Sequence, residues 1–352
     1  MYYCDPPGTY QIENIVNHGT KDFELNYIFF HDQEPIHLDI HVDLFTEIVQ
    51  RNLDLCDNSE ALWSGFVTSE YQSEMVHKVC SIFDWEPYYY FFHGWAALDW
   101  YRGYNNTWLM PDPHERTMQK SFISANRIVA GHRQHRIKLM HQLLKHNVSN
   151  AHISFPLVCP AEQIAVRDVA QNLAYGEYHD IVNQFDQANF PWNFPEESGH
   201  PMHSCWLSLF DVHAESAVYV ITETVYYGQR KHLTEKTFKP ICMQMPFVMV
   251  SSAGSLEYLR SYGFRTFGDI WDESYDQEAD DHVRLQKIGY LLKQIDNMTT
   301  AELQSLYEST IPVIKHNYDH FYNGGFERIL TQELTGMLNT MQRNFNYVDV
   351  DI

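Results

Sequence analysis

The sequence predicts an α/β protein with doubly wound, parallel sheets. Short apolar runs recur along the chain and end in polar or glycine-containing loops, as where residues 217–221 run into Thr222 and Glu223. These runs are almost continuously apolar, which is typical of parallel strands that helices cover on both faces. Segments with helical spacing of apolar residues lie between them, so strand and helix alternate along the chain.

The predicted strands, each an apolar run that stops at a polar loop, are 27–30, 88–92, 122–123, 151–155, 217–221 and 247–250. The predicted helices, which carry apolar residues on one face, are 135–145, 161–175, 235–243, 255–262 and 280–297, followed by a helical region over 300–320 and 325–343. Two prolines within 111–116 disfavour helix before them, so we place the main domain boundary there. The expected parts are a domain over 1–115, a second over 116–320 and a helical tail over 321–352.

Composition excludes several classes of protein. Hydrophobic residues make up 44% of the 352 residues, and no apolar run approaches the length of about 18 that a membrane span requires. The first ten residues, MYYCDPPGTY, lack the basic and apolar regions of a secretory signal. The six cysteines are scattered singly, without a CxxC pair, so we expect neither structural zinc nor disulfides. A reducing, cytoplasmic location fits these features best.

The charge distribution points to a local anion site. The formal net charge of −22 argues against broad binding to nucleic acid, because phosphate contacts require Lys and Arg. Residues 127–146 differ from the rest of the chain, since they are rich in Arg, Lys and His and contain no acid. A basic segment in an acidic chain indicates an anion site. The alternative interpretation is a solvated basic helix face.

Several catalytic motifs are missing. The chain has no GxGxxG after a strand, no GxxxxGK[ST], no HExxH and no GxSxG, which argues against the common dinucleotide, P-loop, metalloprotease and hydrolase sites. The 20 histidines lack the companion acids of a known metal site, and no aspartate pair resembles the metal-binding DxD of one glycosyltransferase class. We therefore expect no metal and no cofactor.

The segment Thr234-Glu235-Lys236 has the chemistry of a nucleotide site. Thr234 suits a helix N-cap, which puts Glu235 and Lys236 in the first turn. The free N–H groups of a helix start and the Lys236 ammonium both favour a phosphate, and Glu235 can accept two ribose hydroxyls. A second strand–turn–helix follows, with Gly254 in its turn. The alternative is an ordinary capped helix, and the residues alone favour neither.

A family resemblance adds to this chemistry. Residues 221–264, from ITETVYYG to LRSYGF, resemble the donor-site motif of fucosyltransferase-like glycosyltransferases of the GT-B fold, with a strand, an acid, a loop and T-E-K at a helix start. Upstream, FISANRIVAGHRQHRIKLMHQLL resembles the family's strand, Asn-containing loop and helix-opening Arg. GFRTFGDIWDESYD resembles phage-encoded relatives, among them the TET-associated glycosyltransferases that modify 5-hydroxymethylcytosine in viral DNA. The resemblance covers roughly residues 120–276.

The resemblance implies a GT-B enzyme with two Rossmann-like domains facing a cleft. Residues 1–115 would form the acceptor side, and 116–320 would bind a nucleotide sugar such as a UDP- or GDP-sugar. The enzyme would transfer the sugar to an acceptor hydroxyl without a metal and with inversion, and the acceptor would be 5-hydroxymethylcytosine of phage DNA in the host cytoplasm. Two alternatives stay open: a glycan, lipid or protein acceptor, and a non-catalytic nucleotide-sugar-binding protein on the same scaffold.

The donor-binding positions that the resemblance transfers to this chain are Glu235, Lys236, Arg136, Asn126, Glu223, Thr234 and Arg133. Glu235 would bind the ribose, Lys236 and Arg136 the diphosphate, and Glu223 would line the pocket. The loop before Arg136 is longer than in the family and holds further arginines. Which arginine meets the phosphate therefore stays open, although the helical pattern that follows Arg136 favours that residue.

An inverting enzyme also needs a base to take the proton of the acceptor hydroxyl. Ligands in open α/β sheets bind at the carboxyl ends of strands, and two predicted strand ends of the N-terminal domain offer candidates. Asp32 and Glu34 follow the first, and His93 follows the second. We prefer Asp32, with Glu34 and His93 next, because a lone histidine is more often a hydrogen-bonded residue under a loop.

Overall fold

The computed structural model describes residues 3–5, 9–11, 26–31, 34–55, 63–106, 110–129, 131–156, 158–159, 163–170, 179–181, 183 and 207–348. The chain divides into two compact units: unit 1 comprises 1–95, 229–232 and 327–352, and unit 2 comprises 96–228 and 233–326. Each unit contains a parallel sheet with helices, so the predicted α/β class is confirmed. The arrangement of two domains around a cleft stays a prediction.

Unit 2 is built on a four-stranded sheet in which every neighbouring pair of strands is parallel. Its strands, in spatial order, are β11 (Phe247–Val250), β10 (Ser216–Thr222), β6 (Lys120–Ala125) and β7 (His152–Ser154). The direction in which successive strands are added to the sheet reverses at β6, because β7 lies on one side of β6 and β10 lies on the other. Ligands of open α/β sheets bind outside the carboxyl ends of strands at such a switch point. The ends of β6 and β10 are therefore the expected place for a site.

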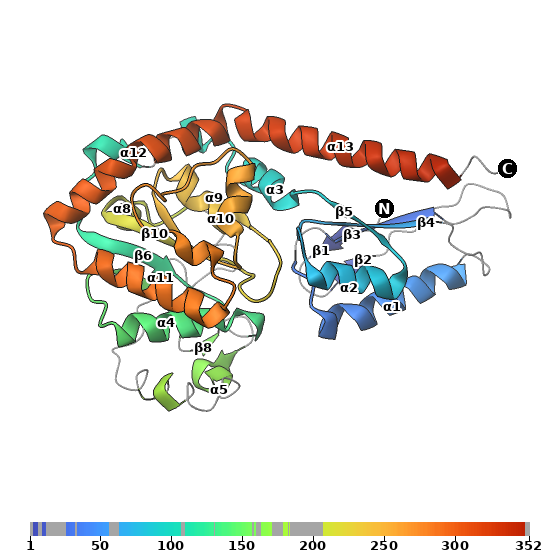
Figure 1. The fold of residues 1–352 in the computed structure, drawn as a ribbon, viewed down its shortest axis with the longest axis horizontal. Helices are drawn as coiled ribbons and strands as arrows, with labels where there is room; N and C mark the ends of the chain where they lie inside the picture. The colour runs from blue at the N-terminus through green and yellow to red at the C-terminus, as the bar shows by residue number, and fades with distance from the viewer. Residues whose placement is uncertain are drawn as a thin grey trace. The chain divides into compact units, whose positions relative to one another are not determined.

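Helices cover both faces of the sheet of unit 2 (Figure 1). On one face lie α4 (His135–Lys145) and α11 (Asp281–Asp296), and on the other lie α9 (Glu235–Cys242) and α12 (Thr300–Tyr322). Every residue of β10 is buried, as expected for a parallel strand between two helical layers. Shorter elements complete the described part: α3 (Phe92–Trp100), η1 (Tyr104–Asn106), η2 (Pro113–Glu115), η3 (Gly131–Arg133), β8 (Val158–Cys159), β9 (Ile164–Ala165), α5 (Val166–Ala170), α8 (Phe210–Ala214), α10 (Ser255–Ser261) and η5 (Ser274–Gln277).

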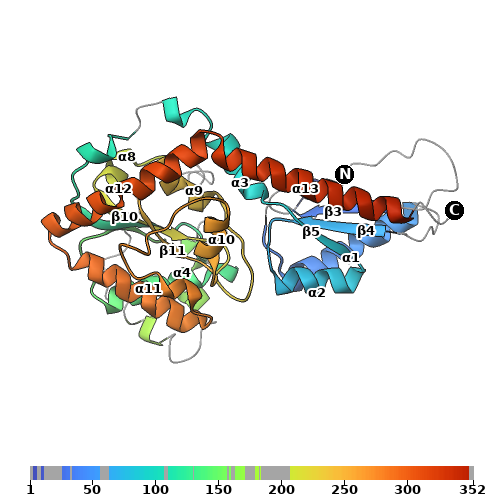
Figure 2. The same cartoon turned by 45° about the horizontal axis from the view of Figure 1, so that its top comes forward.

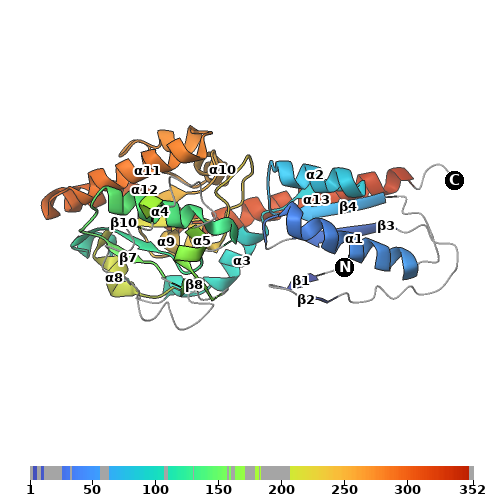
Figure 3. The ribbon, with the colours of Figure 1, turned by 90° about the horizontal axis from the view of Figure 1, so that it is seen from below.

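Unit 1 has a parallel sheet of three strands, in the order β3 (Asn26–His31), β4 (Trp63–Thr68) and β5 (Glu86–Tyr89). Helices α1 (Leu38–Leu55) and α2 (Glu74–Phe83) cover one face, and α13 (Gly325–Val348) covers the other (Figures 2 and 3). Neighbouring residues of β4 show this two-sided burial, because Phe66 packs with α1 and α2 while Val67 packs with Met337 and Met341 of α13. The strands β1 (Tyr3–Asp5) and β2 (Thr9–Gln11) form an antiparallel pair.

The predicted elements match the structure unevenly. A strand is present at or overlapping every predicted position, but the run 88–92 ends early, because Phe92 begins α3. The predicted helix 161–175 is wrong at Ile164 and Ala165, which form β9 and pair antiparallel with β8 before α5 begins at Val166. Residues 161–162 and 171–175 of this prediction lie outside the described residues. The predictions omitted β4, α1 and α2. The run WSGFVT of β4 contains Gly65 and only a few apolar residues, so it gives a weak strand signal.

The division into units also differs from the predicted ranges. The limit falls between Trp95 and Ala96 rather than at 115, and residues 229–232 and 327–352 belong to unit 1. The physical reason is that α13 is no separate tail: its Met337 and Met341 are buried against β4 and β5. None of the helices in the described part combines the length and apolar character that a membrane crossing requires.

A substitution in α13 tests its part in the core of unit 1. Met337→Ala is expected to lower the free energy of unfolding by about 2 kcal/mol, because it removes a buried side chain from the sheet face. Leu338→Ala on the same helix is the control: Leu338 is 49% exposed, and its loss is expected to cost under about 0.5 kcal/mol. Urea denaturation followed by circular dichroism measures both, and equal losses would contradict the packing described.

Candidate anion-binding site

A cavity of about 90 Å³ lies in unit 2 at the predicted switch point. It is lined by Ala125, Arg127, Ile128, Arg133, Arg136, Tyr219, Thr222, Thr224, Lys236 and Lys239. The charged residues in this lining are all cations, although the chain as a whole is strongly acidic. The lining comes from β6, β10 and the loops that follow them, from η3, from the start of α4 and from α9. A cavity with such a lining attracts an anion.

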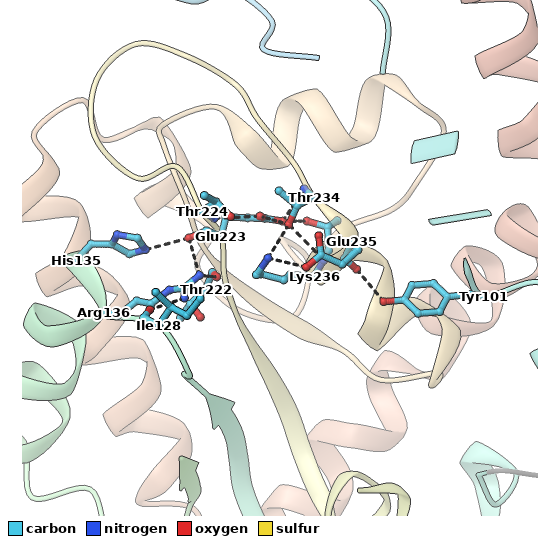
Figure 4. A network of polar contacts seen from close by, with 11 residues as sticks. Tyr101, Ile128, His135, Arg136, Thr222, Glu223, Thr224, Thr234, Glu235 and Lys236 are labelled. Atoms are coloured by element: carbon cyan, nitrogen blue, oxygen red, sulfur yellow. Dashed lines mark hydrogen bonds and ion pairs between the residues drawn. The ribbon is translucent and has the colours of Figure 1, made fainter. Parts of the chain in front are cut away.

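Arg136 is the most deeply buried of the lining arginines. It is the second residue of α4, and its Nη1 and Nη2 donate to the carbonyl oxygens of Ile128 at 2.7 Å and Thr222 at 2.9 Å (Figure 4). Within the described residues its hydrogen bonds go to backbone carbonyls, and its Nε has no partner. Burial and the neighbouring Arg133 lower the pKa of Arg136 to about 10, so the guanidinium stays charged at neutral pH. A buried cation whose hydrogen bonds go to backbone carbonyls favours an anionic ligand.

The segment Thr234-Glu235-Lys236 opens α9, as the sequence predicts. Thr234 is the N-cap, and its hydroxyl oxygen accepts the N–H of Lys236 at 3.4 Å. Lys236 Nζ lies 2.6 Å from Glu235 Oε1, so the predicted ribose ligand and phosphate ligand form an ion pair (Figure 4). The Tyr101 hydroxyl donates to the backbone oxygen of Glu235 at 3.4 Å. Lys236 lines the cavity, whereas Glu235 does not and is connected to it through the ion pair with Lys236.

Four of the seven predicted donor residues do not line the cavity: Thr234 and Glu235, described above, and Asn126 and Glu223. Asn126 is buried, and its side chain bonds to the hydroxyls of Ser124 and Thr222, which joins the ends of β6 and β10. Glu223 is fully buried, and its carboxylate is turned toward α9. Neither residue lines the cavity. The role of Glu223 in lining a donor pocket stays a prediction.

The candidate bases belong to unit 1. Asp32 lies outside the described residues. Glu34 is exposed, and His93 is buried at the start of α3, with its ring 5.0 Å from that of His232. The role of each as a base therefore stays a prediction.

Lys239 and Tyr219 also line the cavity, and neither is among the site residues predicted from the sequence. Lys239 follows Lys236 by three positions on α9, so helical spacing puts both on one face and offers a signal. Tyr219 lies inside a continuous apolar run, and nothing in the sequence separates it from a core residue. In the part of the chain that the structure describes, no three His, Cys, Asp or Glu side chains are grouped to hold a metal ion. Transfer without a metal stays a prediction.

Comparison with known proteins gives little further evidence. No protein-family model matches the chain, and no curated protein matches it. Among solved structures, it is similar to a DNA-modifying beta-glucosyltransferase, solved in the presence and absence of its substrate uridine diphosphoglucose. The two share 10% identity with a TM-score of 0.35, over 82% of this chain and 74% of the other. A likeness at this level is too weak to establish fold or function.

Proposed function

We propose that this chain is a glycosyltransferase that takes its sugar from a nucleotide-sugar donor and needs no metal ion for the transfer. The observation that carries the proposal is the cationic cavity at the switch point, in which Arg136 is buried without a carboxylate among its hydrogen-bond partners. The carboxylate of Glu235 beside this cavity suits the vicinal hydroxyls of a ribose. A diphosphate next to a ribose is the chemistry that a nucleotide sugar presents.

The lining cations would stabilise the departing nucleoside diphosphate. Negative charge grows on the bridging oxygen as the sugar leaves, and Arg136 and Lys236 are placed to neutralise it. Transfer with inversion requires a base that removes the proton of the acceptor hydroxyl, and Asp32, Glu34 and His93 are the candidates. The acceptor oxygen would lose its proton to the base and bond to the anomeric carbon of the sugar. The bond from that carbon to the nucleoside diphosphate would break in the same displacement.

The acceptor that we favour is 5-hydroxymethylcytosine in phage DNA, which would place the enzyme in the host cytoplasm. The segment GFRTFGDIWDESYD supports this choice through its resemblance to phage-encoded enzymes. The target base would have to leave the helical stack, because its hydroxyl is hidden in a duplex. The net charge of −22 argues for the alternatives, a glycan, lipid or protein acceptor. A binding protein without catalysis is the other candidate, and it would need no base.

Binding of free nucleotides tests the donor site. Wild-type protein is expected to bind UDP or GDP, and Lys236→Ala to bind it about tenfold more weakly, because one partly exposed cation is lost. Lys287→Ala is the control, since it removes the same charge from the surface of α11. Isothermal titration calorimetry measures the affinities. Equal affinity of wild type and Lys236→Ala would contradict the proposal that the diphosphate binds in this cavity.

Transfer is tested with a panel of UDP- and GDP-sugars and DNA that contains 5-hydroxymethylcytosine. The expected result is a gain in mass of one sugar on the modified nucleoside after digestion, measured by mass spectrometry. DNA with unmodified cytosine is the control, because it lacks the acceptor hydroxyl. Nucleotide binding without any mass gain would favour a different acceptor or the non-catalytic alternative.

A further inference from the structure

We propose that Glu223 is a positioning residue, whose buried carboxylate fixes the start of α9 and with it the segment Thr234-Glu235-Lys236. Glu223 directly follows β10 and is fully buried. It would act on the ligand only through the helix that it holds. Its effect on sugar transfer rests on the proposed function, whereas its effect on the order of α9 does not.

The carboxylate of Glu223 accepts hydrogen bonds from residues at the start of α9 and from the adjacent residue Thr224. Oε1 accepts from the backbone N–H of Thr234 at 3.0 Å and from the hydroxyl of Thr237 at 2.6 Å. Oε2 accepts from the hydroxyl of Thr234 at 2.7 Å and from the N–H of Thr224 at 3.3 Å (Figure 4). Glu223 thus binds the N-cap residue twice and the helix once, from a strand end that precedes them by a whole loop.

The direction of these bonds orients the N-cap. A hydroxyl has one proton to donate, and Thr234 gives its proton to Glu223. The lone pairs of Thr234 Oγ1 therefore remain for the backbone N–H of Lys236 at 3.4 Å and for Lys236 Nζ at 3.3 Å. The carboxylate thus contributes, through one hydroxyl, to the placement of the Lys236 backbone and ammonium, and the ammonium also pairs with Glu235 at 2.6 Å.

The backbone of Glu223 joins two further parts of the site. Its N–H donates to the carbonyl oxygen of Val250 at the end of β11. Its carbonyl oxygen accepts from His135 Nε2 at 3.0 Å and from Arg136 Nη2 at 3.4 Å, both on α4. Burial, together with the nearby Arg136 charge, lowers the pKa of His135 well below its usual value, so this imidazole is neutral and donates through Nε2. One residue thereby connects β11, α4 and α9.

The chemistry of the donors explains why an acid is tolerated beside an anion site. A buried carboxylate requires hydrogen bonds, and here hydroxyl and amide groups supply them instead of Arg or Lys. Within the described residues, none of these hydrogen bonds comes from a cation that lines the cavity.

Removal of the Glu223 charge distinguishes a positioning role from a purely electrostatic role, because the two roles predict opposite changes in the affinity for uridine diphosphate. Glu223→Gln removes a negative charge close to an anion site, so Coulomb attraction alone would tighten the binding of uridine diphosphate. Positioning predicts the reverse, since a glutamine amide cannot accept all the donors and the start of α9 loosens. We expect binding about tenfold weaker than wild type, measured by calorimetry with uridine diphosphate.

Variants of Thr237 provide the matched pair. Thr237→Val keeps the shape but loses the hydroxyl that donates to Glu223, whereas Thr237→Ser keeps the hydroxyl. We expect weaker binding for Thr237→Val and near wild-type binding for Thr237→Ser. Equal affinities of these two variants, or tighter binding by Glu223→Gln, would overturn the proposal.

Hydrogen exchange without ligand keeps this test apart from the proposed function. Glu223→Gln and Thr237→Val are expected to speed amide exchange in residues 234–239 relative to residues 139–145 of α4. If the wild-type protein binds no nucleotide, the proposed function fails, and the exchange result still decides whether Glu223 orders α9. Unchanged exchange in both variants, with the fold retained by circular dichroism, would overturn the positioning role.

Discussion

Arg136→Met is expected to weaken nucleoside-diphosphate binding by about a hundredfold or more, equivalent to about 3 kcal/mol, because charge-assisted bonds from a buried guanidinium to phosphate are among the strongest polar contacts. Arg136 is buried at the cavity, and its Nε has no partner within the described residues. Arg136→Lys keeps the charge and is expected to recover only part of the affinity, since the planar fork is lost. Calorimetry with UDP and GDP measures these changes.

The control for this experiment is Lys145→Met, which removes one charge from the exposed last turn of the same helix. Arg136 also donates to the carbonyls of Ile128 and Thr222, so its loss is expected to reduce stability as well. The titrations therefore need a temperature at which circular dichroism shows each variant folded. A folded Arg136→Met that binds nucleotide as well as Lys145→Met does would refute the proposed donor site.

The protein is expected to lose about 2 kcal/mol of folding stability between pH 7.5 and pH 6.0. Three buried histidines carry this effect. Burial, aided by His41, lowers the pKa of His31 to about 3, and burial, aided by Lys239, lowers that of His213 to about 3. The pKa of His135 is lowered well below its usual value by burial and by Arg136.

The sign follows from the protons bound in each state. In the unfolded chain these histidines titrate near pH 6.5, whereas in the folded protein they stay neutral to much lower pH. As the pH falls below about 6.5, the unfolded state binds protons that the folded state does not, so stability is lost. Burial raises the pKa of Glu70 and Glu273, which opposes the loss at lower pH. The measurements stop at pH 6.0 because the protein carries little net charge near its isoelectric point of about 5.2, where it tends to associate.

Urea denaturation at the two pH values measures this loss. His31→Phe removes one titrating group from a cluster that already contains Phe45 and Phe66, and it is expected to reduce the pH dependence by about a third. His77→Gln on the exposed side of α2 is the control for the replacement of a histidine outside the core. A rise in stability on acidification would mean that relief of the −22 charge outweighs the buried histidines.

The sequence predicted the parts of the fold that depend on local pattern. β10 and β11 are visible because all their residues are apolar or nearly so, and the N-cap at Thr234 is visible because a hydroxyl precedes an acid and an amphipathic turn. The place of Arg136 near the start of a helix follows from the same local pattern. Short-range patterns thus located much of the candidate site.

The rest depends on contacts between distant parts of the chain. Nothing near Met337 indicates that it packs on β4, which precedes it by most of the sequence. Glu223 shows the same limit at the site. In the sequence, an acid close to a nucleotide motif suggests a contact with the ligand. Only the three-dimensional position of Thr237 shows that the carboxylate oxygens of Glu223 face the protein.

The packing of α13 has a consequence for the synthesis of the protein. The ribosome makes β3, β4 and β5 first and α13 after all of unit 2, because translation follows chain order. Until α13 emerges, the sheet face that holds Val67 and Tyr88 has no cover and presents apolar surface to the cell. The nascent chain therefore covers this face of the sheet only after the segments of unit 2 have been made, and until then the face offers a binding surface to chaperones.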